Sequence, residues 1–339
     1  FFSVDVYKFL LSQGAQQSIT EIISENNNLN DFLNGSETTK VISILSQRVD
    51  KLFENAASKL NLKSLESFSL ALCRLSQAQL FFESSKSDNS FKQYWWHRFT
   101  TNKSIFGESD VINDSLLLDS AGEIMIKCIK SGRPIFHVMR IWGIIGPHLM
   151  EASCHKDITI SRKAVKLIHD VINISLTEHT ELPHFYVNES LFKPFESLLG
   201  LELCEPDIQD QIVSCICEFV EANFSEIRSG WRPLFGALRA ISLNSNILLY
   251  VFKVFLETGN VLVFSYAAVD YVMCLLKHLR VQTCCNDNSE IAFEIIKYLK
   301  SYQEILSSLY LIPGNTAVFQ FAHYIQVSGN FFFFFIFLL

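Results

Sequence analysis

The sequence is poor in the residues that interrupt regular structure and in charge. Its 339 residues include only 13 Gly and 7 Pro, and 19% are charged whereas 49% are hydrophobic. Few helix breakers and many bulky apolar residues favour long packed helices. So small a polar share also means that many helices must be covered on more than one side. The length suffices for one elongated array or two globular domains with a buried core.

Positive charge is scarce and dispersed. Lys and Arg total 28 against 35 Asp and Glu, which gives a net charge of −7 and a pI of about 5.7. No run rich in Lys or Arg stands out. Because nucleic acid requires a positive face, nucleic acid is excluded as an expected partner.

The cysteines and glycosylation signals do not indicate a secreted protein. Nine cysteines are scattered along the chain, and in a chain of this size an odd number predicts buried free thiols rather than a disulfide framework. Six Asn-x-Ser sequons occur, at Asn34, Asn102, Asn113, Asn173, Asn188 and Asn223. Two of them, Asn173 and Asn223, lie in strongly helical stretches where a glycan would be awkward, so we interpret the sequons as chance matches.

Motifs for catalysis and cofactor binding are missing. The sequence contains no Gly-x-Ser-x-Gly elbow, no P-loop and no Gly-x-Gly-x-x-Gly. Cys215 and Cys217 are separated by one residue and Cys284 and Cys285 are adjacent, so neither pair has the spacing of a structural zinc site. We therefore expect no catalytic site, no cofactor and no metal.

Apolar residues recur at the three- and four-residue spacing of a helix, most clearly in 65–82, 164–176 and 208–220. These residues are Leu65, Phe68, Leu72, Leu75 and Phe82; Ala164, Val165, Ile168, Val171, Ile172 and Leu176; and Ile208, Ile212, Cys215, Ile216, Phe219 and Val220. No stretch shows the sustained alternation of a strand. Helix pairs at roughly 40-residue spacing predict an all-α fold, an armadillo/HEAT-like helical-repeat solenoid.

Glycine and proline mark the ends of several helices. Pro183 separates two helices, because the residue before a proline is pushed out of the α region. A helix over 208–228 is followed by Gly230, which we expect to adopt the left-handed conformation that lets the chain reverse. Pro233 then falls in the first turn of the next helix, where its missing N–H costs nothing.

Polar and irregular stretches suggest four segments. We predict an N-terminal helical segment over 1–83, an irregular linker over 84–114, a helical-repeat domain over 115–310 and a C-terminal segment over 311–339. The linker holds the aromatic run Tyr94–Arg98. Such a run more often closes the end of a core than forms a docking patch.

The chain starts at Phe1 rather than Met, so we expect a fragment. The tail Phe331–Leu339 is too short to span a bilayer, and we interpret it as translated intron.

Three blocks carry a resemblance to a known family. They are Phe68–Leu80, Asn188–Glu196 with its Lys-Pro-Phe-Glu run, and Ile208–Phe235 with its Ser-Gly-Trp followed by an aromatic residue four positions on. In order and spacing they resemble the large brefeldin A-inhibited ARF guanine nucleotide-exchange factors, from about residue 40 to 310. The stretch Arg133–Lys156 and Pro183-His-Phe resemble one divergent member of that family.

The resemblance implies an armadillo-like helical scaffold downstream of an exchange domain, with no catalytic residue in this chain. It implies a cytoplasmic protein, peripheral to Golgi or secretory-granule membranes, that works in vesicle traffic. Expected partners are ARF-type small GTPases or other traffic proteins, with self-association and peripheral membrane contact as further expectations. The signature residues carried over, all with structural roles, are Lys193, Pro194, Phe195, Glu196, Ser229, Gly230, Trp231 and Phe235.

The spacing of the signature also has a direct physical interpretation. Trp231 and Phe235 are four residues apart, so both can point at the neighbouring helix pair and fix its angle. We favour this structural role over a partner-binding one.

Three other classes of protein remain open at this point. A generic helical-repeat interaction module would show grooves and apolar patches, and an enzyme would show a pocket of converging ionisable groups. A membrane-associated protein would use the Phe-rich tail or Val251–Val263, although Lys253 and Glu257 favour a core position for the second.

Overall fold

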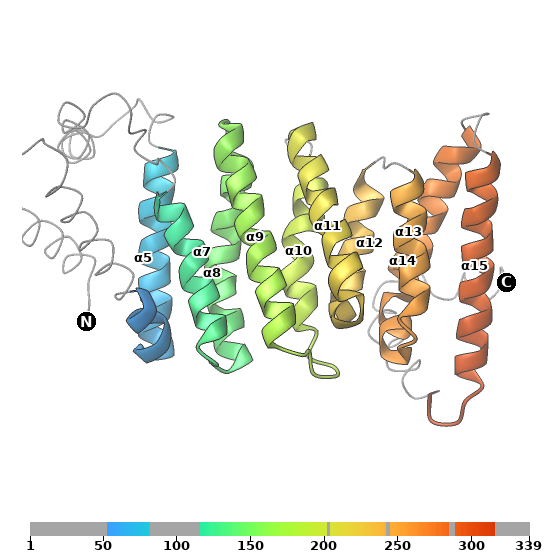
Figure 1. The fold of residues 1–339 in the computed structure, drawn as a ribbon, viewed down its shortest axis with the longest axis horizontal. Coiled ribbons are helices and arrows are strands. Elements are labelled where there is room, and N and C mark those ends of the chain that lie inside the picture. Colours follow the sequence, from blue (N-terminus) through green and yellow to red (C-terminus); the bar gives the residue numbers. More distant parts are fainter. Residues whose placement is uncertain (1–52, 82–115, 202–203, 242–244, 285–288, 316–339) are drawn as a thin grey trace, which may run out of the picture. The chain divides into compact units, whose positions relative to one another are not determined.

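The computed structural model describes residues 53–81, 116–201, 204–241, 245–284 and 289–315 (Figure 1). Every regular element within these ranges is a helix, which confirms the predicted all-α helical-repeat class. The predicted linker 84–114 and the Phe-rich tail lie outside the described residues.

The chain divides into two compact units, Phe1–Ala152 and Ser153–Leu339. Their boundary falls inside the range 115–310 that the sequence suggested as one domain.

The first unit contains α5 (Leu62–Leu80), α7 (Leu116–Lys130) and α8 (Ile135–Ser153). Helix α5 begins after Asn61, whose side chain accepts a hydrogen bond from Ser64 N at 2.9 Å. It packs against α7. Arg133, just before α8, donates to the carbonyl oxygen of Leu60 at 2.6 Å and to that of Ala57, so it ties the start of α8 to the chain before α5.

The second unit is built from seven α-helices and one short 3₁₀ helix within the described residues. They are α9 (Ile158–Glu178), α10 (Val187–Leu199), α11 (Pro206–Ile227), η4 (Arg228–Gly230), α12 (Trp231–Ala240), α13 (Ser245–Glu257), α14 (Val261–Cys284) and α15 (Ser289–Tyr310).

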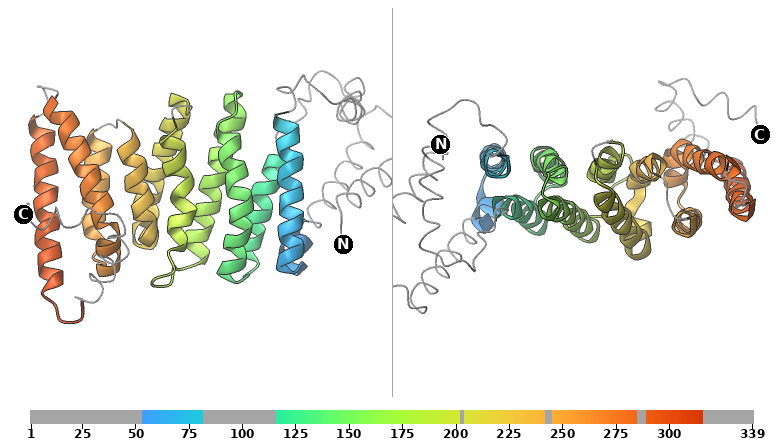
Figure 2. Two further views of the ribbon diagram at one scale, coloured as in Figure 1. Left: turned by 180° about the vertical axis from the view of Figure 1, so that it is seen from behind. Right: turned by 90° about the horizontal axis from the view of Figure 1, so that it is seen from above.

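Helices of the second unit stack in two interleaved rows. Helix α9 contacts α11, α11 contacts α13, and α13 contacts α15, while α10 contacts α12 and α12 contacts α14. Each helix therefore packs on the helix two places further along the chain, which is how helical repeats bury an amphipathic face that no single pair could hide. The view from above in Figure 2 agrees with this arrangement.

The predicted apolar faces form the core. All the apolar residues named above in 164–176 and 208–220 are buried, as are Leu65 and Leu72 of α5, whereas Phe68 and Leu75 are half-buried. Phe82 lies outside the described residues. Pro233 lies in the first turn of α12, as predicted.

The described cysteines are all free thiols, which confirms that part of the expectation. Five are buried, Cys217 is half-buried and Cys154 is exposed, so burial is not general. Burial raises the pKa of the Cys73 and Cys215 thiols to about 12, which keeps both protonated and unreactive.

One described helix is long and apolar enough to cross a membrane by length and composition. This stretch is Val261–Val281 in α14, and 61% of its most apolar window is buried. It packs against α12 and α15, which is what a core helix of a helical repeat does, and such helices pass the same test.

Candidate functional site

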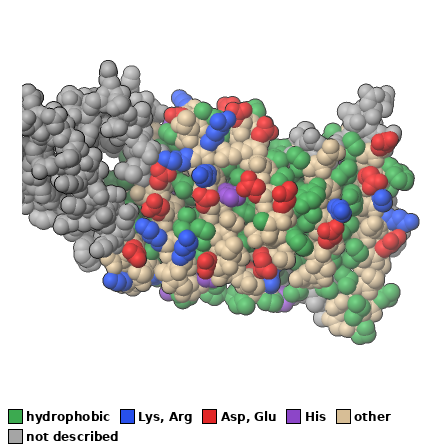
Figure 3. Space-filling model, in the orientation of Figure 1, with side chains coloured by type: hydrophobic (Ala, Val, Ile, Leu, Met, Phe, Trp, Pro, Cys, Tyr) green, Lys and Arg blue, Asp and Glu red, His purple; other side chains and the backbone are tan. Residues whose placement is uncertain are grey.

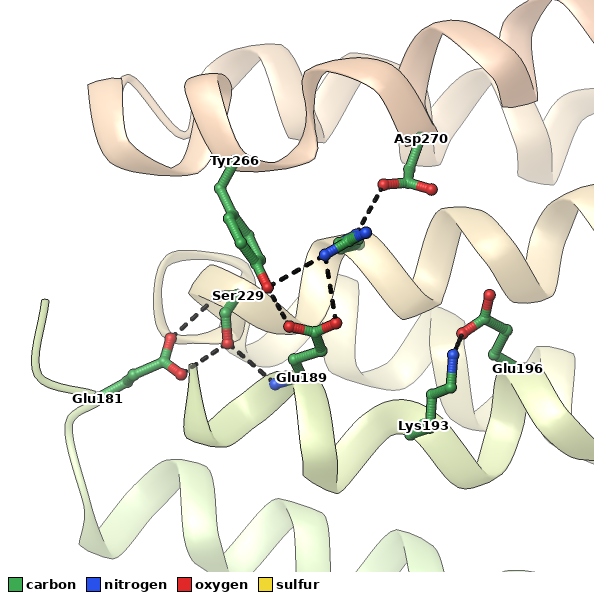
Figure 4. Close-up of polar contacts among 8 residues, drawn as sticks. Glu181, Glu189, Lys193, Glu196, Ser229, Tyr266 and Asp270 are labelled. Carbon is green, nitrogen blue, oxygen red and sulfur yellow. Dashed lines mark hydrogen bonds and ion pairs between the residues drawn. The ribbon is translucent and has the colours of Figure 1, made fainter. Parts of the chain in front are cut away.

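The second and third signature blocks come together where α10 meets η4 and the start of α12. Helix α10 packs extensively against both. We call this cluster, formed by Glu181, Asn188, Glu189, Ser229, Gly230 and Trp231, the joint. Figure 4 shows the polar contacts of Glu181, Glu189 and Ser229.

A buried carboxylate lies at the centre of the joint. Glu181 accepts hydrogen bonds from the N–H of Ser229 at 3.0 Å and from Ser229 Oγ–H at 2.6 Å (Figure 4). It also accepts from the backbone N–H of Asn188 at 2.8 Å. Ser229 Oγ in turn accepts from the N–H of Glu189 at 2.9 Å. These contacts link the loop before α10, the first turn of α10 and η4, and a buried charge is tolerated only with such partners.

Asn188 makes a second link between α10 and the end of α11. Its side-chain N–H₂ donates to the carbonyl oxygens of Glu226 at 2.8 Å and Ile227 at 3.2 Å. Those carbonyls belong to the last turn of α11, where no intrahelical donor follows. Asn188 is buried, so this sequon cannot carry a glycan in the folded chain.

Two further sequons, Asn173 and Asn223, are half-buried in helices. Nδ2 of Asn223 donates a hydrogen bond to Oδ1 of Asn173 at 3.4 Å.

The reversal after α11 differs from the prediction at Gly230. Gly230 has φ −63° and ψ −19°, which is right-handed, and the residue with positive φ is Arg228, with φ 46° and ψ −112°. Glycine is needed at 230 for space, because a Cβ there would lie 2.5 Å from Cδ2 of Phe192 in α10. The prediction was wrong because close packing between helices cannot be told from turn geometry in the sequence.

Trp231 opens α12 and is fully buried. Its ring stacks on Phe235 at 5.5 Å and meets Phe255 of α13 edge-on at 5.2 Å. Phe235 extends the cluster to Phe255 at 4.9 Å and to Tyr271 of α14 at 5.1 Å. The indole N–H of Trp231 has no hydrogen-bond partner among the described residues, so its packing must offset a cost of about 1–3 kcal/mol.

A charged group beside the joint connects α10, α12 and α14. Arg232 donates from Nε to Asp270 Oδ2 at 3.0 Å and lies 3.5 Å from Glu189 Oε1 through Nη1 (Figure 4). Tyr266 donates its hydroxyl hydrogen bond to Glu189 and lies under the Arg232 guanidinium, 5.4 Å from ring centroid to Cζ. Burial raises the pKa of Asp270, and Arg232 opposes that rise.

The Lys-Pro-Phe-Glu run lies on α10 and faces different surroundings at each position. Lys193 is exposed and pairs with Glu196 at 2.6 Å, Pro194 is buried inside the helix, and Phe195 packs 6.3 Å from Phe219. The Glu196 side chain fills the space where a Cβ on Gly236 would lie. Phe195 therefore contacts the other row of helices and Glu196 contacts α12 in the same row, whereas the ion pair of Lys193 stays within α10.

The ionisable groups of the joint are used in helix-to-helix contacts. Within the described ranges no three His, Cys, Asp or Glu side chains come close enough to hold a metal ion. Glu181 and Asp270 were not predicted from the sequence, and no local pattern marks Glu181. Asn188 and Arg232 lie in the blocks that carry the family resemblance, but no contact was predicted for either side chain.

The loop that enters the joint has an unusual backbone. His184 has φ 68° and Tyr186, just before α10, has φ 51°. Left-handed backbone at a residue other than Gly costs on the order of 1–3 kcal/mol and persists only where the surroundings determine it. The contacts of Glu181 and the stacking of Tyr186 on Tyr266 at 4.3 Å provide such surroundings.

Comparison with known proteins identifies this region. A family model described as Mon2/Sec7/BIG1-like, HDS, matches residues 175–254, which include the whole joint. Mouse brefeldin A-inhibited guanine nucleotide-exchange protein 3 is 35% identical over 334 aligned positions, covering 87% of this chain and 15% of the mouse protein. The human protein of the same name is 36% identical over 315 positions, covering 83% and 14%.

A more distant relative shows the same relationship. The ADP-ribosylation factor guanine nucleotide-exchange factor sec71 of Schizosaccharomyces pombe is 23% identical over 192 positions, covering 51% of this chain and 10% of that protein. The chain thus spans about one seventh of the length of the mammalian relatives it matches. This chain is therefore a helical segment related to the large brefeldin A-inhibited guanine nucleotide-exchange proteins.

Proposed function

We propose that this chain is a non-catalytic helical scaffold segment of an ARF guanine nucleotide-exchange factor-like protein. Its task is to hold a fixed surface for an ARF-type small GTPase while exchange chemistry, where it occurs, belongs to a different part of the protein. The setting is vesicle and secretory-granule traffic at the Golgi, with the protein cytoplasmic and peripheral to those membranes.

The observation that carries the proposal is the use of the signature residues. Ser229, Gly230, Trp231 and Phe235 are all buried in contacts between helices, and the charges beside them are paired. Residues that fix the angle between repeats are what a scaffold requires. The relationship to guanine nucleotide-exchange factors supplies the class of partner, because those relatives are named for exchange on ADP-ribosylation factors.

The generic interaction module remains the alternative. It is favoured by exposed apolar side chains, including Leu182 and Phe185 before α10 and Phe293 on α15. It differs from the proposal only in the identity of the partner, so a direct binding measurement separates the two.

The test uses the full chain and purified ARF loaded with a fluorescent GDP or GTP analogue. We expect saturable binding in at least one nucleotide state and no acceleration of GDP release, with EDTA-stimulated release as the positive control. Acceleration of release by catalytic amounts of the chain would contradict the scaffold. Failure of both nucleotide states to bind would remove ARF as the partner and leave the generic module.

A further inference from the structure

The loop between α9 and α10 presents apolar side chains to solvent. Leu182, Pro183, His184 and Phe185 are all exposed, and the exposed fractions of Leu182 and Phe185 are 58% and 48%. The loop lies at the lower edge of the second unit in Figure 1, where hydrophobic surface is also visible in Figure 3. Two large apolar side chains three residues apart on a projecting turn have the form of an anchor pair.

The base of this loop is fixed by the joint. Glu181, directly before Leu182, receives three hydrogen bonds through its carboxylate, and its carbonyl oxygen accepts from Nη1 of Arg228 at 2.7 Å. At the other end Tyr186 stacks on Tyr266. Inside the loop the N–H of Phe185 donates to the carbonyl oxygen of Leu182 at 3.3 Å.

Fixing the loop at both ends lowers the entropy that binding would remove. The left-handed residues His184 and Tyr186 show that the backbone is held in one conformation by its surroundings. An anchor pair that is already ordered binds without the cost of ordering a flexible segment. The signature residue Ser229 therefore helps to fix this loop through Glu181, in addition to joining two helices.

Charge around the loop favours a protein partner over an anionic membrane. Residues 179–186 contain no Lys or Arg, Glu178 beside them is exposed, and the chain carries a net charge of −7. On the face that Figure 3 shows, acidic and basic side chains are interspersed over α9 and α11. Binding to anionic lipid would require a cluster of basic side chains.

We propose that loop 182–185 is a docking element that inserts Leu182 and Phe185 into an apolar pocket on the ARF-type GTPase. This inference rests on the proposed function for the identity of the partner. It adds the contact site and the reason why the joint lies directly behind it.

The test compares two double variants of the full chain by titration with purified ARF in the nucleotide state that binds the wild type more tightly. Leu182→Ser with Phe185→Ser removes the anchors. Leu201→Ser with Phe293→Ser is the matched control, because both of these side chains are exposed in the same unit, on the α10–α11 connection and on α15. We expect the loop variant to bind at least about tenfold more weakly and the control to remain within about twofold of wild type.

A third variant tests the fixed loop. Glu181→Gln leaves the exposed side chains unchanged but removes the buried charge that holds the loop, so we expect weaker ARF binding with the helical circular dichroism retained. Affinity equal to wild type in this variant would contradict the role of the fixed base.

Two results would overturn the docking element itself. Equal ARF binding by the loop variant and wild type would do so and leave the proposed function standing, whereas failure of the wild type to bind ARF would remove both. Cosedimentation with neutral phosphatidylcholine vesicles is the second measurement. Cosedimentation that is lost in the loop variant, with ARF binding unchanged, would reassign the loop to membrane contact.

Discussion

The ring of Phe192 in α10 lies where a side chain at position 230 would have to go. A Cβ built on Gly230 would approach Phe192 Cδ2 to 2.5 Å and Cε2 to 2.8 Å. Both rows of helices meet at this point, because Phe192 also packs edge-on against Phe219 of α11 at 5.3 Å. The close approach of η4 to α10 therefore depends on the missing side chain.

Gly230→Ala should lower the free energy of unfolding by about 1–3 kcal/mol, because a fully buried ring must move to admit the methyl group. Urea denaturation followed by circular dichroism measures this. Gly143→Ala in α8 is the control, since its Cβ would meet nothing within 4 Å, and it should be neutral or stabilising. Equal effects of the two substitutions would contradict the close approach.

Trp231→Ala should be destabilising by about 3–5 kcal/mol, because it empties a fully buried site between α12 and α13. Thermal unfolding checks the prediction, with Tyr250→Ala on the exposed side of α13 as the control. A melting temperature equal to that of wild type would mean that Trp231 does not hold the two helices together.

The contact between Glu181 and Ser229 should show coupling. Glu181→Gln should cost about 1.5–3 kcal/mol, because hydrogen bonds to a buried charge are lost, and Ser229→Ala about 1 kcal/mol. In a double-mutant cycle the combined loss should be smaller than the sum, because one interaction is removed twice. Strict additivity would show that the two side chains act independently.

Acid should weaken the first unit through His148. Burial lowers the pKa of this imidazole below its usual 6.5, and the nearby Glu151 opposes that effect only in part. The unfolded chain therefore binds a proton near pH 6.5 that the folded chain does not, so stability falls as pH drops below that value. His148 Nε2 also lacks a hydrogen-bond partner among the described residues.

His148→Leu should therefore reduce the loss of stability between pH 7.5 and 5.5 and should not lower stability at pH 7.5. Urea denaturation at pH 7.5 and at pH 5.5, monitored by hydrogen exchange of peptides from α8, measures the stability at each pH. An unchanged difference between the two pH values would show that other groups cause the acid sensitivity.

The periodic apolar residues were sufficient to predict the fold class. Ile168 and Ile216 belong to faces whose spacing follows the helix, and both are fully buried. That information is local, because one helix turn determines which side chains share a face. The stacking of each helix on the second one along also follows, since single pairs cannot hide such faces.

The joint could be predicted only in part. Trp231 and Phe235 were identified by their spacing and their resemblance to a family, and their roles as a fixed contact between helices remain a prediction. Glu181 and Asp270 were missed because their partners lie 48 and 38 residues away in sequence. Hydrogen bonds of that range leave no local pattern. The positive φ of Arg228 could not be predicted either, since nothing in the residue type favours it.

Hydrogen exchange of the joint in Trp231→Ala shows whether the signature residues join neighbouring helix pairs into one unit. We expect faster exchange in the α9–α10 loop, α10, α12 and α13, with little change in the first turns of α9, which lie far along the chain from the joint. Faster exchange confined to the residues next to position 231 would contradict it.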